Sequence, residues 1–200
     1  CMAFDIGLGC SGYTYGLSVI TSLMKSSGIQ KGLLLVGDVS TVTNHYEDRS
    51  TYPLFGDAGT ATDIELSGDD EWIFDLHSDG SGEDAIKIPH GGARNLVDEN
   101  SLKEVKQDDG NVRSQMHLHL DGLAVFNFSI TKVPKSIMQF MSEVGATPEN
   151  VDHFVMHQAN KLMNETIRKK LKFEPDKVPY SIREYGNTSS ASIPLTMVTE

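Results

Sequence analysis

The chain has 200 residues, enough to bury a sizeable core in one domain or in two small ones. Its formal net charge of -11 argues against a general nucleic-acid binder, because such proteins gain affinity by neutralising phosphates with Lys and Arg. The two cysteines, Cys1 and Cys10, exclude a disulfide framework, and a stable bridge between them is not expected. A hydrophobic content of 38% and a charged content of 22% are typical of a globular protein.

Membrane insertion and secretion are not indicated. The longest apolar runs, such as GLLLVG at 32–37, are too short to span a bilayer, and the start CMAFDIG has no basic region of a signal peptide. We therefore expect a soluble protein of a reducing cytoplasm that has no membrane partner.

The first part of the chain alternates between predicted strands and helices. Residues 2–8 (MAFDIGL) predict a short strand. Residues 11–27 predict a helix that ends before Gly28, with apolar side chains on one face at Tyr13, Leu17, Ile20 and Met24. The apolar run KGLLLVGDVS (31–40) predicts a strand that is covered on both faces. This order of elements indicates an α/β protein.

The middle of the chain is less regular. Residues 55–66 (FGDAGTATDIEL) and 72–80 (WIFDLHSDG) predict strands, and the polar, glycine-rich residues 81–115 predict loops. A helical pattern then runs from Gly122 to Gly145, with a predicted kink at Pro134.

Two later segments repeat the strand-to-helix theme of the start. VDHFVMHQAN (151–160) predicts a strand and a polar turn before a helix at 160–172, and VPYSIREYG (178–186) predicts a strand before a helix from residue 188. Cys10, His157 and Asn187 stand at the three junctions. Because functional groups of open parallel sheets collect outside the carboxyl ends of the strands, we expect these three side chains to share one site.

The three residue types suit acyl-transfer chemistry. A thiol at a helix N-terminus meets the positive end of the helix dipole, which favours thiolate and makes Cys10 a candidate nucleophile. His157 offers a hydrogen-bond donor or a proton carrier near neutral pH, and Asn187 offers an uncharged donor. Together they suit the binding of negative charge that develops on an oxygen. Taken singly, each has a structural alternative: a small core cysteine, a satisfied histidine and a helix cap.

Five segments carry a family resemblance, namely FDIGLGCSGYTYGLSV, FGDAGTAT, HLHLDGLAVFNFSI, HQAN and YGNTSSASIP. In this order they resemble the β-ketoacyl-acyl carrier protein synthase III family of the thiolase-like superfamily. The resemblance implies an α/β fold with a layered αβαβα architecture and mixed sheets, incomplete in this chain. It assigns about residues 1–115 to an N-terminal half that holds the nucleophile, and about residues 116–200 to a C-terminal half that holds His and Asn.

The resemblance implies that Cys10, His157 and Asn187 form a catalytic triad. In the implied reaction, an acyl-CoA acylates the cysteine, and a malonyl thioester on acyl carrier protein then loses carbon dioxide and condenses with the acyl group. The implied assembly is a homodimer, with no metal and no cofactor besides the CoA and carrier-protein thioesters that are its substrates. A site without a second cysteine, together with HQAN and GNTS, favours this initiating type over thiolases and over chain-elongating synthases.

Substrate contacts follow from the resemblance and from charge. The resemblance places Gly122, Phe126 and the loop around Leu123 in the acyl pocket. The stretch KLMNETIRKKLK (161–172) sets five cations against one acid, Glu165; the cations are Lys161, Arg168, Lys169, Lys170 and Lys172. A basic helix beside HQAN suits binding of an acidic carrier protein or of CoA phosphates. A solvated helix face with cations near its C-terminus explains the same pattern equally well.

Two other features favour structural roles. His117 and His119 in HLHL are predicted on one face of a strand, but two ligands without a third do not make a metal site. Asp57 in FGDAG is predicted to be buried and to fasten a turn.

Two further functions stay open: a non-decarboxylating acyl transferase of the same superfamily, and a non-catalytic fragment that binds a carrier protein. Family members are longer than this chain, which lacks their N-terminal βαβ part and their closing glycine-rich segment. We expect a fragment of a full synthase, or else a shortened family member. In both cases the missing pocket walls argue against full activity of this chain alone.

Overall fold

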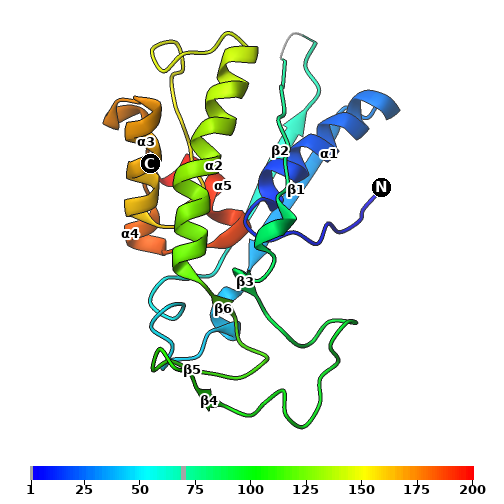
Figure 1. The fold of residues 1–200 in the computed structure, drawn as a ribbon. Coiled ribbons are helices and arrows are strands. Elements are labelled where there is room, and N and C mark those ends of the chain that lie inside the picture. The colour runs from blue at the N-terminus through cyan, green and yellow to red at the C-terminus, as the bar shows by residue number, and fades with distance from the viewer. Residues whose placement is uncertain (1, 69–70) are drawn as a thin grey trace.

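The computed structural model describes residues 2–68 and 71–200 (Figure 1). Cys1 lies outside the described residues, so the expectation about its pairing is not addressed. No helix within the described ranges combines the length and the apolar character needed to cross a bilayer.

The first helix forms as predicted. Helix α1 (Gly12–Ser27) ends at Gly28, which adopts the left-handed conformation at φ 67° and donates its N–H to the carbonyl of Met24. A Cβ at Gly16 would lie 2.7 Å from Cδ1 of Leu34, so glycine at this position lets the helix approach the neighbouring strand closely. Tyr13 and Met24 are buried on the same side of the helix.

The main sheet has two antiparallel strands, β1 (Lys31–Asp38) and β2 (Ala58–Glu65), which pair along their whole length. Helix α1 lies along this ribbon (Figure 1). Side chains of β1 alternate between half-buried and exposed, and Leu33 and Leu35 are 60% and 67% exposed. The prediction of a strand covered on both faces is therefore wrong for one face, because successive side chains point to opposite sides and α1 packs on one side only.

Several predicted strands are irregular in the structure. Residues 2–8, 72–80, 151–157 and 178–181 have no strand conformation. A short apolar run becomes a strand only where a neighbouring strand receives its hydrogen bonds. Residues 2–8 make a local bond from Leu8 to Ile6, and the last segment turns into helix α4 (Ile182–Tyr185). The strand pairs of the described residues are antiparallel, and an isolated bridge between Phe55 and Asn187 is parallel.

The region between β2 and α2 consists mainly of loops, as predicted. It contains the short helical turn η2 (Gly80–Gly82) and two small ribbons, β3 (Ile86–Lys87) with β6 (His119–Leu120) and β4 (Val105–Lys106) with β5 (Val112–Arg113).

Two sequence predictions about individual residues are corrected. His117 precedes β6, so His117 and His119 do not lie on the same strand as expected. Asp57 is exposed rather than buried, but it does fasten a turn, because its carboxylate accepts hydrogen bonds from the backbone and the hydroxyl of Thr41 in η1 (Ser40–Thr43).

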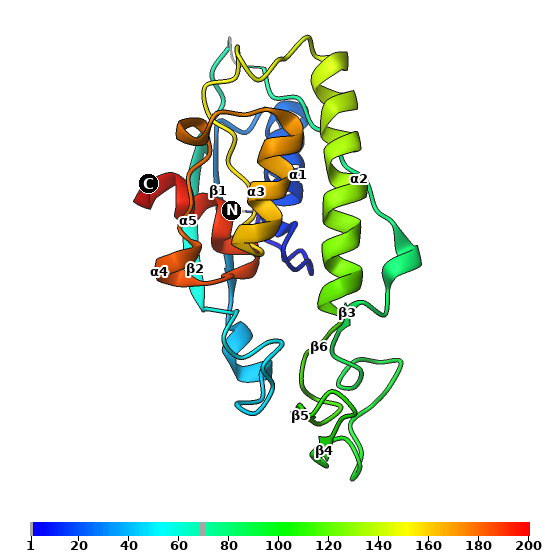
Figure 2. The same cartoon turned by 60° about the vertical axis from the view of Figure 1, so that its left-hand side comes forward.

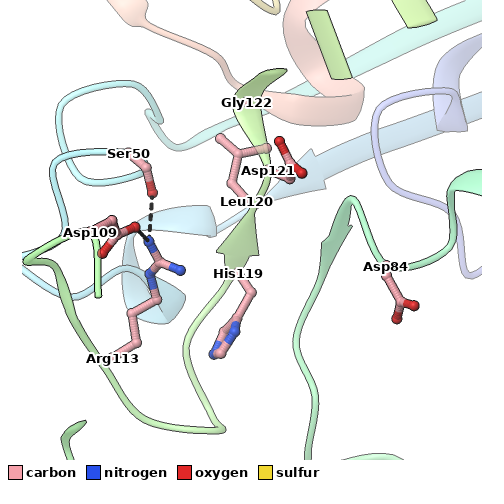
Figure 3. A pocket seen from close by; sticks show the side chains of 8 residues that line it. All are labelled: Ser50, Asp84, Asp109, Arg113, His119, Leu120, Asp121 and Gly122. Carbon is pink, nitrogen blue, oxygen red and sulfur yellow. Dashed lines mark hydrogen bonds and ion pairs between the residues drawn. The ribbon is translucent and has the colours of Figure 1, made fainter. Parts of the chain in front are cut away.

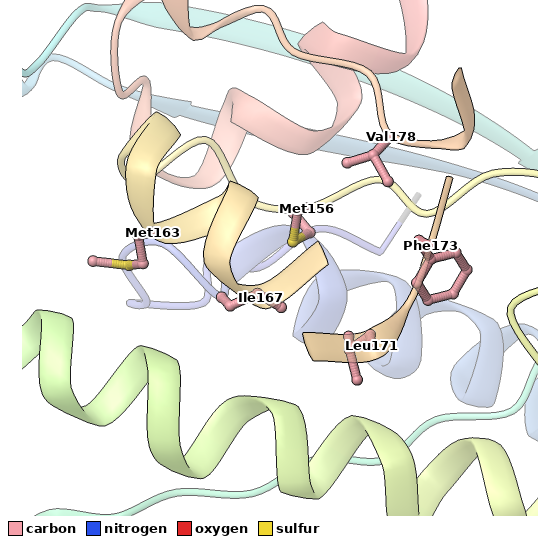
Figure 4. Packing of buried hydrophobic residues seen from close by; sticks show 6 residues of the cluster. All are labelled: Met156, Met163, Ile167, Leu171, Phe173 and Val178. Carbon is pink, nitrogen blue, oxygen red and sulfur yellow. The ribbon is translucent and has the colours of Figure 1, made fainter. Parts of the chain in front are cut away.

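Two helices build the main apolar core. Helix α2 (Gly122–Glu143) is capped by Asp121, whose carboxylate accepts a hydrogen bond from the Ala124 N–H. The buried Pro134 lies within this helix, which Figure 2 shows as one continuous ribbon. Helix α3 (Lys161–Leu171) lies beside it. Figure 4 shows the buried cluster between α3 and the segments around it, which comprises Met156, Met163, Ile167, Leu171, Phe173 and Val178.

The chain ends in short helical elements that lead back to the sheet. These are η3 (Pro175–Lys177), α4, η4 (Ser189–Ala191) and α5 (Ser192–Thr199). Both η4 and α5 contact the β1–β2 ribbon, and η4 also contacts α1. The last helix forms where the sequence predicts it, and this path brings residues 187–192 next to the start of α1.

Candidate active site

Ser189 is the residue around which the predicted triad gathers. Its hydroxyl donates to the Sγ of Cys10 at 3.9 Å, and its backbone N–H donates to the Oδ1 of Asn187 at 2.9 Å. The Ser189 backbone also lies near the ring of His157, where it acts to raise the pKa of the ring. Segments that are far apart in the sequence therefore bring all three predicted side chains to one residue. Their catalytic roles remain predictions.

Cys10 lies directly before α1, where its thiol is free and half-buried. Burial raises the pKa of the thiol, since it disfavours the thiolate, and the nearby Asp38 carboxylate acts in the same direction. The hydrogen bond from Ser189 and the backbone of Cys10 itself oppose the shift only in part. The net direction is opposite to the expectation that the helix N-terminus favours thiolate, because desolvation outweighs the local donors.

His157 is held as a neutral ring at physiological pH. Burial lowers its pKa to about 4, and the nearby Ser189 backbone acts against this shift. The Nδ1 atom lies 2.6 Å from the Oγ of Ser192. Its main chain is held as well, because its carbonyl accepts a hydrogen bond from Nδ2 of Asn164 on α3 at 2.9 Å. Of the two roles left open for His157, hydrogen-bond donor and proton carrier, the donor role fits a ring that stays neutral.

Asn187 is 4% exposed and is locked to the segment that precedes β2. Its backbone N–H donates to the Leu54 carbonyl at 2.9 Å, and its own carbonyl accepts from the Gly56 N–H at 3.0 Å. A Cβ on Gly56 would lie only 2.0 Å from the carbonyl oxygen of Tyr185, and Gly186 has a φ of 70°. Glycine is required at both positions, because the two segments touch through their backbones.

The side chain of Asn187 fits both interpretations of this residue, the structural cap and the uncharged hydrogen-bond donor. Its Oδ1 caps the following turn by accepting from Ser189. The orientation of the amide is thereby set, and within the described ranges no residue accepts a hydrogen bond from Nδ2. The amide nitrogen is therefore the end that remains for a ligand.

Three residues of this site were not singled out from the sequence. Ser189 and Ser192 belong to the quoted NTSSAS segment, where a run of small hydroxyl residues after Asn187 is the available signal. Asp38 is the last residue of β1, and its Oδ2 accepts from the backbone N–H and the hydroxyl of Ser190 at 3.1 and 2.6 Å. A carboxylate at the carboxyl end of a strand is the pattern that points to it.

The residues predicted to bind substrate lie in different surroundings. Gly122 lines a cavity of about 540 Å³ near the small ribbons, in which Arg113 bonds to Ser50 and pairs with Asp109 (Figure 3). The other lining residues are Asp84, His119, Leu120 and Asp121. Leu123 is 70% exposed, and Phe126 packs against the core cluster next to α3. None of the three predicted triad residues lines this cavity.

The basic stretch of α3 is partly engaged within the protein. Arg168 donates to both carboxylate oxygens of Glu165 and to the carbonyl of Phe173, and Lys170 donates to the Ile130 carbonyl. Lys161 lies over the ring of Tyr180, with Nζ 5.7 Å from its centre. Arg168 and Lys170 therefore have partners within the protein, and Arg168 does not lie on a solvated helix face, since its side chain is only 11% exposed.

The histidines of HLHL bond to the backbone and hydroxyl of Ser114. The Nδ1 of His117 lies 2.9 Å from both the N and the Oγ of Ser114, and the Nε2 of His119 lies 3.1 Å from its carbonyl oxygen. Within residues 2–68 and 71–200, no cluster of three or more His, Cys, Asp or Glu is arranged to hold a metal ion.

Two protein-family models match the segments that hold the three candidate site residues. Residues 4–81, which include Cys10, match the family model described as 3-oxoacyl-[acyl-carrier-protein (ACP)] synthase III. Residues 141–199, which include His157 and Asn187, match the model of the C-terminal part of the same synthase. The chain belongs to the 3-oxoacyl-[acyl-carrier-protein] synthase III family.

Individual members of the synthase III family agree with this assignment. The chain is 33% identical over 98% of its length to a β-ketoacyl-[acyl-carrier-protein] synthase III of Streptococcus uberis, and 36% identical over 98% to that of Campylobacter curvus. It spans 57% and 56% of the length of these two relatives.

Solved structures of the synthase III family share the fold. A crystal structure of a 3-oxoacyl-(acyl-carrier-protein) synthase III superposes with a TM-score of 0.92 at 35% identity, covering 98% of this chain and 59% of that one. The synthase from Burkholderia xenovorans gives a TM-score of 0.85 at 36% identity, covering 100% of this chain and 56% of that one. The expected thiolase-like α/β fold class is thereby confirmed.

Proposed function

We propose that the protein to which this chain belongs is an acyltransferase that condenses an acyl-CoA primer with malonyl-acyl carrier protein to give a 3-oxoacyl-acyl carrier protein. One observation carries the proposal: Ser189 contacts a thiol, an imidazole and a carboxamide, in a chain of the synthase III family. The pathway would be the start of fatty-acid synthesis or a related route in the cytoplasm.

In the first stage the Sγ of Cys10 attacks the thioester carbonyl of the acyl-CoA. A bond forms between Sγ and the acyl carbon, the bond to the CoA sulfur breaks, and the proton of the Cys10 thiol leaves with the CoA thiol. The backbone N–H of Cys10 is suited to hydrogen-bond the oxyanion of this step. The half-buried position of Cys10 keeps the acyl thioester away from bulk water.

In the second stage the malonyl thioester loses carbon dioxide, and the electron pair of the broken bond becomes an enolate. The neutral ring of His157 and the Nδ2 of Asn187 donate hydrogen bonds to the enolate oxygen. The enolate carbon then attacks the acyl carbonyl, the new carbon–carbon bond forms, and the Cys10 sulfur leaves and takes up a proton from solvent. No charged acid is needed at His157, which agrees with its lowered pKa.

The substrates are the partners that this function requires. The basic stretch 161–172 is the proposed docking surface for the acidic carrier protein, and Lys161, Lys169 and Lys172 remain candidates for this contact. The CoA and carrier-protein thioesters are the only cofactor-like groups in the proposal, and the assembly is a homodimer.

Mass spectrometry tests the acylation step. After incubation with acetyl-CoA, the full protein should gain one acetyl group, and peptide mapping should place it on Cys10 rather than Cys1. The Cys10→Ala variant should not gain it at that peptide. Labelling of Cys1 alone, or equal labelling of wild type and variant, would contradict the proposal.

Release of carbon dioxide tests the condensation. The acetylated protein should release carbon dioxide from malonyl-acyl carrier protein and form a 3-oxoacyl product. Acylation without this release points to the non-decarboxylating acyl transferase. Carrier-protein binding without acylation points to the non-catalytic alternative.

A further inference from the structure

Ser192, the first residue of α5, is fixed beside the imidazole of His157. It is 1% exposed, and its Oγ lies 2.6 Å from Nδ1 of the ring. Its carbonyl accepts the hydroxyl of Thr196 at 2.7 Å, and the hydroxyl of Ser181 lies 2.7 Å from the same Thr196 oxygen. These buried contacts hold the backbone of Ser192 in one position relative to the ring.

The direction of the short hydrogen bond follows from counting donors and acceptors. The Oγ of Ser192 also accepts the backbone N–H of Gln158 at 3.3 Å, and that N–H is a donor only. A hydroxyl carries one hydrogen, and among the described residues Nδ1 of His157 is the only acceptor within hydrogen-bond distance of Oγ. If Nδ1 carried the proton, both lone pairs of Oγ would accept, and the buried hydroxyl hydrogen would have no acceptor among the described residues. The hydroxyl therefore donates to Nδ1, the unprotonated nitrogen of a neutral ring.

We propose that Ser192 is a positioning residue that holds His157 in the tautomer with its proton on Nε2. Nε2 is then a hydrogen-bond donor and has no lone pair with which to act as a base. The catalytic meaning of this assignment rests on the proposed function, because it makes His157 a donor to the enolate oxygen rather than the group that removes the Cys10 proton. The assignment of the proton itself does not depend on turnover.

Nitrogen-15 NMR of the wild-type chain tests the proton assignment at neutral pH. The resonances of His157 are identified among the seven histidines by their loss in a His157→Gln variant. We expect Nε2 to show a one-bond coupling to hydrogen, and Nδ1 to resonate as an unprotonated nitrogen that accepts a hydrogen bond. A proton coupled to Nδ1 would overturn the proposal without any variant.

A set of variants tests the role of the hydroxyl. In Ser192→Ala the Nδ1 resonance should shift toward that of an unbonded nitrogen, and a second tautomer should appear. Ser192→Thr should restore the wild-type pattern. Ser181→Ala is the matched control, since it removes another buried serine hydroxyl that packs on α5 and should leave both ring nitrogens unchanged. Identical Nδ1 shifts in wild type and Ser192→Ala would overturn the proposal.

The outcomes separate this inference from the proposed function. If Cys10 fails to accept an acetyl group while Nε2 carries the proton, the function is wrong and the role of Ser192 stands. If Cys10 is acetylated and Nδ1 carries the proton, the function stands and the role of Ser192 is wrong.

Discussion

The two sides of the molecule are held together by different forces. Around α3, six buried apolar side chains form a continuous cluster, with α2 packed against it (Figure 4). On the β1–β2 ribbon, one face meets α1 while Leu33 and Leu35 on the other face are exposed. Hydrophobic burial is therefore concentrated on the α2–α3 side.

The candidate active site lies where these two sides meet, and polar contacts connect them there. Asp38 of the ribbon bonds to Ser190, and residues 54–56 bond to Asn187. Such contacts add little net stability, but they have directional geometry. The apolar cluster therefore provides stability, while the polar contacts set the geometry of the site.

The largest effect should come from opening the apolar cluster. Phe173 is 2% exposed and stacks on Phe154 with ring centres 4.7 Å apart. Phe173→Ala should lower the free energy of unfolding by about 3–5 kcal/mol, because it removes transfer energy and leaves a cavity. Urea denaturation measures this. Phe128→Ala on α2, where the ring is 46% exposed, should cost far less. Equal costs would contradict the concentration of stability in the cluster.

The second-largest effect should come from forcing apart the two backbone segments that meet at the site, around Gly56 and Asn187. Gly56→Ala would place a methyl group 2.0 Å from the Tyr185 carbonyl, so one segment must move and Asn187 must move with it. We expect a loss of about 1–3 kcal/mol, as for overpacking, together with a larger proportional loss of carbon dioxide release in the full protein. Gly59→Ala, whose methyl group would have its nearest neighbour at 4.0 Å, is the control. Unchanged activity in Gly56→Ala would show that the contact does not position Asn187.

The acid side of the stability curve should carry a signature of His157. Its pKa is about 4 in the folded chain and 6.5 in a model peptide, so the unfolded chain binds more protons between these values. Stability should fall as pH drops from about 6.5 to 4, by at most about 1.4 kcal/mol per pH unit for this one group. His157→Gln should reduce the slope of unfolding free energy against pH in this window.

The His157 test is a comparison of slopes, because burial lowers the pKa of His117 as well. His117→Gln should also reduce the slope of unfolding free energy against pH, independently of His157. Glu165 affects a lower pH range. Arg168 lowers the pKa of Glu165 to about 2, so the stability that its ionised carboxylate contributes is lost only below about pH 4.5. An unchanged slope in His157→Gln would show that the ring is not buried as described.

The smallest effect should come from the exposed face of the ribbon. Leu35→Thr should change the free energy of unfolding by no more than about 0.5 kcal/mol, as is usual for exposed positions. Leu34→Thr is its matched partner on the neighbouring position, where the side chain contacts α1. It should cost clearly more, since a hydroxyl replaces packed methyl groups. Thermal unfolding of the two variants measures the difference.

Helices α1, α2, α3 and α5 were predictable from the sequence to within a few residues, whereas α4 lies in the segment 178–186 that was predicted as a strand. The glycines at 28 and 145 both have positive φ, and the apolar spacing of α1, α2 and α3 determines which face is covered. The strand predictions at 2–8 and 151–157 were wrong, because strand formation depends on partners that the local sequence does not specify. The meeting of the triad was predicted through the parallel-sheet rule, and it occurs although the described strand pairs are antiparallel.

The sequence alone determined the family, the helices and the identity of the three candidate side chains, because these depend on local spacing and on ordered motifs. The tertiary structure decided their environment. The raised pKa of Cys10, the neutral ring of His157 and the contacts of Ser189, Ser192 and Asp38 arise from burial and from distances between remote segments. Desolvation and hydrogen bonding depend on which atoms surround a group in space, and neighbours in the sequence do not specify them.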